Sequence, residues 1–264
     1  MRPRGALRSI GLLVAFTMGT STVSAQAATN SPNPYVQSIP ESTITVSAAA
    51  SLTDVFPIIA SAFNKRYPQI TVTFNFAGSN ALVEQLRAGA PADVIATADE
   101  KTMQKAVASS LARRPMVFAR NSMAIATPAG NPANITRLKD LENSKVTTAI
   151  CAPTVPCGRL ATELFTKNNI NVTPVTKEVD VRAVMGKVIA DAVDAGIVYS
   201  TDTKAAGDAV TTIEIPDSQN LFTNYPIAPV TESKNARAAK AFVDYARYSS
   251  TAQQILRAWG FSKP

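Results

Sequence analysis

The chain has 264 residues, a formal net charge of +7, no histidine and two cysteines. Without histidine, the chain has no histidine general base, no Ser-His-Asp or Cys-His catalytic arrangement and no histidine metal ligand. The lysines and arginines form no cluster that favours nucleic-acid binding, and two cysteines are too few for a four-thiolate zinc site.

The first residues have the pattern of a secretory signal peptide. Arg2, Arg4 and Arg8 give a basic start, residues 10 to 18 are mostly apolar, and Ala25-Gln26-Ala27 forms a small-x-small cleavage site. The apolar run is too short to span a bilayer, so a membrane anchor is the less favoured alternative.

Removing a signal peptide of residues 1 to 27 leaves 237 of the 264 residues and lowers the charge to +4, because three arginines leave. This length is enough for one large or two small domains. No cysteine follows the apolar run to carry a lipid, so we expect a soluble protein in the periplasm or an equivalent extracytoplasmic space. Cys151 and Cys157 lie six positions apart, which in an exported protein favours a disulfide, with two buried free thiols as the alternative.

The rest of the chain alternates between β-like and helical patterns. Residues 28 to 42 are rich in Ala, Asn, Ser and Pro and predict a flexible leader. The expected strands are Ile44–Ala49, Thr71–Phe76, Val94–Ala96, Met123–Thr127, Val146–Cys151, Gly196–Tyr199, Thr211–Ile215 and Tyr225–Val230. Strands that alternate with helices predict βαβ units in mostly parallel sheets.

Two helices are expected to start with serines directly after strands. Ser51 precedes a helical apolar pattern over residues 52 to 67, and Asp54 is the expected second member of a capping box. Pro57 lies inside this pattern and predicts a kink. Ser79 is the expected cap of the second helix. A helix that starts after a strand directs free N–H groups out of the sheet edge, which suits an anion.

The later part of the chain has similar features. Residues 155 to 158 form a loop before a helix expected over residues 159 to 167, and Asp180 can cap a helix whose first turn exposes the Val181 N–H. Tyr199 ends an apolar strand, at the edge where open α/β folds bind ligands. Each feature alone also has a structural explanation, because serine caps and packed tyrosines are common.

Taken in order, six segments resemble the molybdate-binding component of ABC transporters, the ModA family. The segments are residues 44 to 52, 76 to 80, 88 to 93 with 98 to 99, 155 to 158, 180 to 182 and 196 to 200. The resemblance extends from about residue 43 to Phe261 and implies an α/β, two-lobed periplasmic-binding-protein type II (Venus flytrap) fold with a mostly parallel sheet in each lobe.

The resemblance also implies how the chain is divided. Residues 43 to 121 and 227 to 264 are expected to form lobe 1, and residues 122 to 226 to form lobe 2. The implied partner is the membrane permease of an ABC importer, and we expect the protein to be a monomer that needs no cofactor.

Carried over position by position, the resemblance implies five oxyanion-binding residues: Ser51, Ser79, Cys157, Val181 and Tyr199. The serines would donate hydroxyl and backbone N–H groups, Cys157 and Val181 backbone N–H groups, and Tyr199 its phenolic hydroxyl. Cys157 departs from the family, which commonly has alanine there, and a bridge to Cys151 would stiffen this loop. Molybdenum would be bound as the oxyanion, without direct metal ligands.

The expected ligand is molybdate, and tungstate should also bind. A fully deprotonated tetrahedral dianion accepts hydrogen bonds only, and therefore suits a site built of donors, whereas protonated phosphate would require an acceptor. Asp54, Asp93 and Asp180 are interpreted as helix-cap or lobe-packing carboxylates, because an ionised group in the cleft would repel the dianion.

Other hypotheses remain open at the level of sequence. Sulfate or another tetrahedral oxyanion is the alternative ligand, since sulfate differs from molybdate only in size. An exported enzyme is disfavoured by the absence of histidine, and an adhesin has no supporting repeat.

Overall fold

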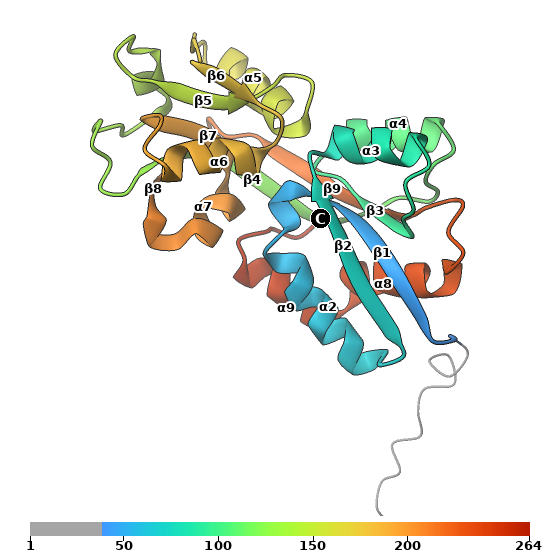
Figure 1. The fold of residues 1–264 in the computed structure, drawn as a ribbon. Coiled ribbons are helices and arrows are strands. Elements are labelled where there is room, and N and C mark those ends of the chain that lie inside the picture. Colours follow the sequence, from blue (N-terminus) through green and yellow to red (C-terminus); the bar gives the residue numbers. More distant parts are fainter. Residues whose placement is uncertain (1–38) are drawn as a thin grey trace, which may run out of the picture.

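The computed structural model describes residues 39 to 264 (Figure 1). The expected signal peptide, residues 1 to 27, and residues 28 to 38 of the expected leader lie outside the described residues. In the remainder of the leader, Ile39 is buried in the core and the first strand begins at Ser42. Within the described part, no helix combines the length and apolar character that a membrane crossing requires.

The strands and helices alternate along most of the chain, as expected. The strands are β1 (Ser42–Ala49), β2 (Ile70–Ala77), β3 (Val94–Ala96), β4 (Met116–Pro128), β5 (Thr148–Cys151), β6 (Thr176–Glu178), β7 (Ala195–Tyr199), β8 (Val210–Glu214) and β9 (Phe222–Pro229). The α-helices are α2 (Val55–Arg66), α3 (Ser79–Arg87), α4 (Glu100–Ala108), α5 (Pro156–Lys167), α6 (Val181–Ile189), α7 (Ser200–Ala206), α8 (Ala236–Tyr248) and α9 (Ser250–Ala258). Short 3₁₀ helices are η1 (Ala50–Leu52), η2 (Leu138–Glu142) and η3 (Gly207–Ala209).

The strands form a mixed sheet that bends into two lobes (Figure 1). Its order is β2-β1-β3-β9-β4-β7-β5-β6, with β8 paired to β4. We call the part around β1, β2 and β3 lobe 1, and the part around β5, β6, β7 and β8 lobe 2; β4 and β9 pass between them. The expected two-lobed α/β class is confirmed.

The expectation of mostly parallel sheets holds only for the outer strands. The pairs β1–β2 and β1–β3 in lobe 1, and β5–β6 and β5–β7 in lobe 2, are parallel. The pairs that β4 makes with β7, β8 and β9 are antiparallel, as is β3–β9. The two long strands β4 and β9 lie side by side where the chain passes between the lobes. The chain leaves lobe 1 through β4 and returns through β9, so the two strands run in opposite directions.

Strand β4 is longer than the strand expected over residues 123 to 127, because its two halves have different partners. Residues from Met116 to Ser122 pair with β9, whereas residues from Met123 onward pair with β7 and β8. The short strand β6, with the sequence Thr-Lys-Glu, carries no apolar pattern and was not expected.

The start of α2 differs from the sequence expectation. This helix begins at Val55, so Pro57 is its third residue and lies in the first turn. Backbone N–H groups in the first turn have no acceptor within the helix, so a proline there breaks no hydrogen bond and the expected kink is not required.

Aromatic side chains from both ends of the chain fill the core of lobe 1. The ring of Phe56 on α2 lies 5.6 Å from that of Phe118 on β4 and 6.0 Å from that of Phe242 on α8. Helices α2, α8 and α9 lie together beside β1 and β2 (Figure 1). Lobe 1 therefore depends on the first and the last part of the chain.

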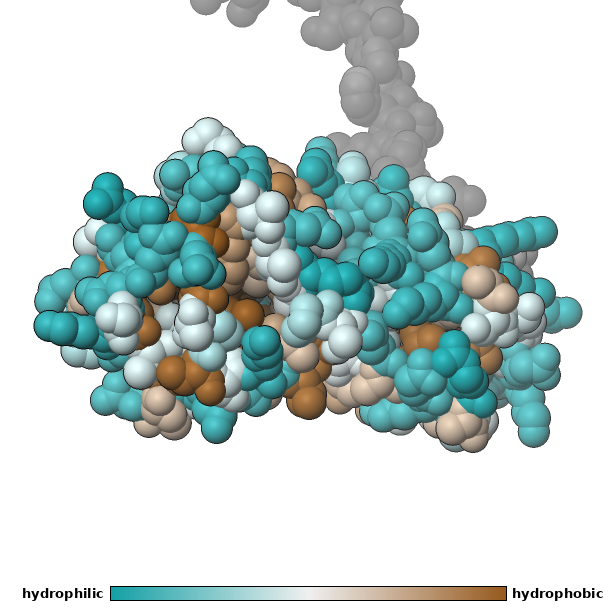
Figure 2. Space-filling model, turned by 90° about the horizontal axis from the view of Figure 1, so that it is seen from above, coloured by the Kyte–Doolittle hydropathy of each residue, from teal (hydrophilic) through white to brown (hydrophobic). Residues whose placement is uncertain are grey.

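The face seen in Figure 2 is mostly hydrophilic, with small hydrophobic groups between polar side chains.

Candidate functional site

The five residues expected to bind the ligand all line one cavity between the two lobes. The cavity has about 230 Å³ of empty space, part of it open to solvent. Its lining residues are Ala49, Ala50, Ser51, Gly78, Ser79, Ala98, Val155, Pro156, Cys157, Asp180, Val181 and Tyr199. These residues lie where β1, β2, β3 and β7 end and where α3, α5 and α6 begin, so strand ends and helix starts converge on the cavity.

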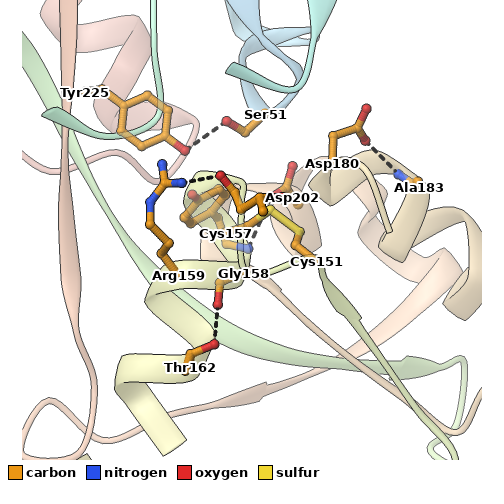
Figure 3. Close-up of a disulfide and its surroundings, with 12 residues drawn as sticks. Ser51, Cys151, Cys157, Gly158, Arg159, Thr162, Asp180, Ala183, Asp202 and Tyr225 are labelled. Atoms are coloured by element: carbon orange, nitrogen blue, oxygen red, sulfur yellow. Dashed lines mark hydrogen bonds between the residues drawn. A yellow bond between two sulfur atoms is a disulfide. The ribbon is translucent and has the colours of Figure 1, made fainter. Parts of the chain in front are cut away.

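Ser51 is held in the cavity wall by a tyrosine from the far end of the chain. It lies in η1, and its hydroxyl oxygen is 2.8 Å from the Tyr225 hydroxyl (Figure 3). The expected cap and capping box are wrong, because the residue before α2 is Asp54, which makes no side-chain cap bond. The 3₁₀ turn moves the helix start past Ser51 and leaves its hydroxyl facing β9 and the cavity.

The hydrogen bonds around Tyr225 allow the Ser51 hydroxyl to accept from it. The Asn121 amide nitrogen donates to the Tyr225 oxygen at 3.3 Å, so the single Tyr225 proton is available for Ser51. A hydroxyl has one proton and two acceptor positions. When Ser51 accepts from Tyr225, its own proton is free to be donated to a ligand.

Ser79 can likewise donate its hydroxyl proton to a ligand in the cavity. It is the first residue of α3, preceded by Gly78, so the expected cap at Ser79 is also wrong. Its hydroxyl oxygen accepts a hydrogen bond of 3.1 Å from the Ala98 N–H, and the hydroxyl proton is therefore left for the cavity.

Cys157 lies in the first turn of α5, which starts three residues earlier than expected, at Pro156. The expected disulfide between Cys151 and Cys157 is present, with Cα atoms 5.7 Å apart (Figure 3). It ties the end of β5 to the helix start at the cavity. A Cβ on the next residue, Gly158, would lie 1.9 Å from the Ala152 carbonyl oxygen, so only glycine permits this close turn.

Helix α6 presents its start in the same way, and here the expected cap is confirmed. The Asp180 carboxylate accepts a hydrogen bond of 2.9 Å from the Ala183 N–H. Val181 is the first residue of the helix and is buried at the cavity. Together with α3 and α5, three helix starts carry N–H groups without intrahelical acceptors, and their dipoles place partial positive charge at the cavity.

Tyr199 supplies a buried hydroxyl that the protein does not satisfy. The residue is 1% exposed at the end of β7, and its hydroxyl has no hydrogen-bond partner among the described residues. Burial raises the pKa of Tyr199 well above its ordinary value, so the phenol keeps its proton. Burial likewise raises the pKa of the Asp202 carboxyl to about 7. The Asp202 side chain accepts a hydrogen bond from the Tyr199 N–H.

The carboxylates near the cavity are occupied by the protein, as expected. Asp54 pairs with Arg182 at 2.9 Å, Asp180 caps α6, and Asp93 accepts from the Thr45 N–H and the Ser233 hydroxyl within lobe 1. Within residues 39 to 264 no group of three or more His, Cys, Asp or Glu side chains could hold a metal ion.

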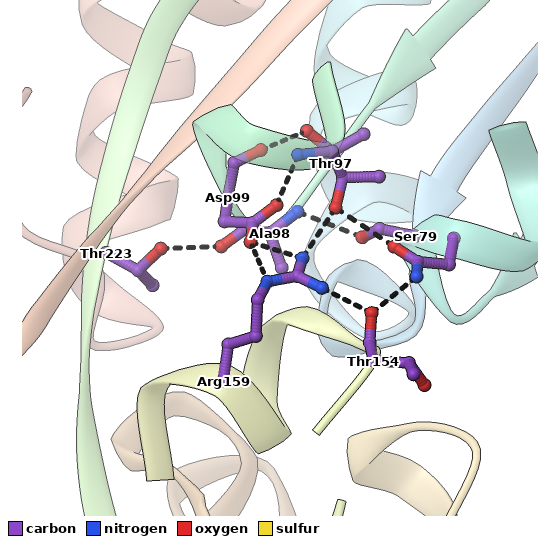
Figure 4. Close-up of polar contacts among 9 residues, drawn as sticks. Ser79, Thr97, Ala98, Asp99, Thr154, Arg159 and Thr223 are labelled. Carbon is purple, nitrogen blue, oxygen red and sulfur yellow. Dashed lines mark hydrogen bonds and ion pairs between the residues drawn. The ribbon is translucent and has the colours of Figure 1, made fainter. Parts of the chain in front are cut away.

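Three contributors to the site were not identified from the sequence: Tyr225, Asn121 and Arg159. Tyr225 is 174 positions from Ser51, and no local motif connects them. Arg159 lies beside the cavity, but its guanidinium is held by the Asp99 carboxylate and the Thr154 carbonyl (Figure 4).

Comparison with known proteins places the chain in a family. Residues 44–262 match the model of the bacterial extracellular solute-binding protein family. The molybdate-binding protein ModA of Mycobacterium tuberculosis is 37% identical over 222 residues, which cover 84% of this chain and 85% of that protein.

Two solved structures have a similar fold. The periplasmic molybdate-binding protein of Azotobacter vinelandii matches with a TM-score of 0.74 and 19% identity, over 84% of this chain and 99% of that one. The sulfate-binding protein SubI of Mycobacterium tuberculosis matches with a TM-score of 0.72 and 20% identity, over 84% and 87%. At these identities the structures show the fold alone. The family match and the relative together show that this chain belongs to the bacterial extracellular solute-binding proteins and, among them, to the ModA family.

Proposed function

We propose that this protein captures molybdate, and also tungstate, outside the cytoplasm and delivers it to the membrane permease of an ABC importer. The observation that carries the proposal is that the hydroxyl groups in the cavity wall can donate hydrogen bonds to a ligand. The Ser79 hydroxyl accepts from the Ala98 N–H, the Ser51 hydroxyl can accept from Tyr225, and the buried Tyr199 hydroxyl has no partner among the described residues. Such a set suits an oxyanion that carries no proton.

The five proposed ligand-binding residues are Ser51, Ser79, Cys157, Val181 and Tyr199. The serines and Tyr199 would donate hydroxyl groups, and the helix starts at Ser79, Cys157 and Val181 would donate backbone N–H groups. Hydrogen bonds to a charged group contribute roughly 1.5–3 kcal/mol each, so this set can reach micromolar or tighter binding after the costs of association. A site without a cationic ligand permits release when the lobes separate.

We further propose that lobe 1 comprises residues 43 to 121 and 227 to 264, and lobe 2 residues 122 to 226. The change of partners within β4, between Ser122 and Met123, supports the first boundary. The proposed protein is exported, acts as a monomer and binds rather than transforms its ligand. Membership of a solute-binding family supports the last point.

Calorimetric titration of the protein without residues 1 to 27 tests the ligand assignment. We expect tight binding of molybdate and tungstate, weaker binding of sulfate and none of phosphate. Tight sulfate binding together with weak molybdate binding would replace the proposed ligand by sulfate, which the shared fold with a sulfate-binding protein keeps as the second candidate. Steady product formation from a candidate substrate would instead indicate an enzyme.

A further inference from the structure

Two arginines of lobe 2 lie beside the anion cavity but bind lobe 1 instead of facing the cavity. Arg159 is the fourth residue of α5, two positions after Cys157, and Arg182 is the second residue of α6, directly after Val181. A cation in the first turn of a helix is unfavourable for the helix dipole. The position of both arginines therefore requires another explanation.

Arg159 forms a partly buried connection between the lobes (Figure 4). Its Nε donates to the Asp99 carboxylate at 3.0 Å, a second nitrogen donates to the Thr102 hydroxyl at 2.8 Å, and a third reaches the Thr154 carbonyl. The side chains of Arg159 and Asp99 are 14% and 16% exposed. The Asn80 amide of α3 also donates to the Thr154 carbonyl, at 2.5 Å, so this side of the cavity is closed by several polar contacts.

Arg182 forms the second connection, at the start of α2. Its guanidinium lies 2.9 Å from the Asp54 carboxylate, and these side chains are 39% and 33% exposed. Just before α6, a Cβ on Gly78 of lobe 1 would lie 2.7 Å from the Val179 carbonyl oxygen of lobe 2. The backbones of the two lobes therefore meet closely, with room for glycine only.

We propose that the Arg159–Asp99 and Arg182–Asp54 pairs form a latch that holds the two lobes together over the cavity and thereby sets the affinity and the release rate of the bound oxyanion. The proposal rests on the proposed function for its ligand. The four side chains act as positioning residues, because none of them is among the residues that line the cavity. The latch also keeps both guanidinium groups occupied, so the cavity is served by neutral donors.

The latch predicts an effect on affinity opposite in sign to that of simple charge repulsion. Asp54→Asn and Asp99→Asn each remove a negative charge near the cavity, which by Coulomb's law alone would strengthen binding of a dianion. Because the latch would be weakened, we expect the molybdate dissociation constant to rise by about threefold for Asp54→Asn, about tenfold for Asp99→Asn, and more for both together. The rise should appear as faster dissociation in stopped-flow measurements. Tighter or unchanged binding in the double variant would overturn the latch.

Two further variants separate the latch from other effects. Asp244→Asn makes the same charge change at a side chain of similar exposure, 34%, whose partner Lys240 lies on the same helix, and the dissociation constant should stay within about twofold. Exchanging the second pair, Asp54→Arg with Arg182→Asp, should restore affinity to within about threefold of the wild type, since the pair is re-formed. This exchange keeps the proposal testable if Asp99→Asn, at the N-cap of α4, does not fold.

A readout without any ligand distinguishes failure of the latch from failure of the proposed function. In small-angle X-ray scattering of the anion-free protein, the Asp54→Asn/Asp99→Asn variant should have a larger radius of gyration than the wild type. Equal radii would overturn the latch whatever the protein binds. A wild type that binds no tetrahedral oxyanion would contradict only the proposed function.

Discussion

We expect the Tyr199 hydroxyl to affect ligand binding and the stability of the fold in opposite directions. It is buried without a hydrogen-bond partner among the described residues, so we expect it to lower the stability of the free protein and to be available to a ligand. Tyr199→Phe should weaken molybdate binding by about tenfold or more and raise the free energy of unfolding of the free protein by about 1 kcal/mol.

Calorimetry and urea denaturation measure these two effects. Tyr248→Phe is the control, because Tyr248 is 66% exposed and is not among the residues lining the cavity. If Tyr199→Phe binds molybdate as tightly as the wild type, Tyr199 is not a ligand.

Asp202 makes stability depend on pH in a defined window. Burial raises the pKa of its carboxyl from 3.8 to about 7, so the folded protein holds this proton over a range in which the unfolded chain has lost it. The contribution of Asp202 to the free energy of unfolding should therefore fall as pH rises from about 4 to about 7, and stay constant above.

Denaturation of the wild type and of Asp202→Asn across this pH range checks the prediction. The difference between them should change by an amount on the order of 2–4 kcal/mol in favour of the variant as pH rises. A constant difference would show that the buried carboxyl titrates normally.

At the scale of residues, the sequence predicted which residues line the cavity, but not the contacts that hold them there. Ser51 and Ser79 lie at the cavity, but neither is a cap, because the helix starts are displaced by the 3₁₀ turn and by Gly78. The support that Tyr225 and Asn121 give to Ser51 comes from distant strands. Such contacts depend on the tertiary fold and leave no local pattern.

At the scale of elements, the disulfide fixes the start of α5 at the cavity. Replacing Cys151 and Cys157 together by alanine should lower the free energy of unfolding by about 2 kcal/mol, because a short loop is no longer closed in the unfolded chain. Molybdate affinity should also fall, since the Cys157 N–H is then held less firmly.

Urea denaturation and calorimetry measure both losses. Treatment of the wild type with a thiol reductant under denaturing conditions should reproduce the stability loss, whereas the double variant should not respond. If affinity is unchanged in the double variant, the close turn at Gly158 positions α5 without the bridge.

Elements with a strong local apolar pattern were predicted well. Elements whose length or direction depends on pairing with distant strands were not. The predicted strand over residues 44 to 49 matches β1 closely, and Asp180 caps α6 as expected. The full length of β4 was missed because its first half pairs with β9 from the other end of the chain. The antiparallel direction of β9 likewise depends on a distant partner.

At the scale of the whole molecule, one hydrophobic cluster extends through both lobes, from Phe56 and Phe242 in lobe 1 to Val184 and Ile197 in lobe 2. We therefore expect the lobes to unfold together. Phe242→Ala should cost about 3–5 kcal/mol through lost burial and a residual cavity, and should shift a single transition.

Scanning calorimetry with circular dichroism and Trp259 fluorescence as parallel probes tests this expectation. Coincident transitions in the wild type and in the variant indicate one cooperative unit. A variant in which only part of the transition moves to lower temperature would show that the lobes unfold separately.

The position of β9 also determines when the protein can fold during synthesis. This strand lies between β3 and β4, and α8 follows it with Phe242 for the aromatic core. A chain that leaves the ribosome N-terminus first holds β1, β2 and β3 long before their sheet and core can be completed. Lobe 1 can close only once nearly the entire chain has been made. For the proposed export, this order of synthesis means that the nascent chain is still unfolded when a translocation channel accepts it.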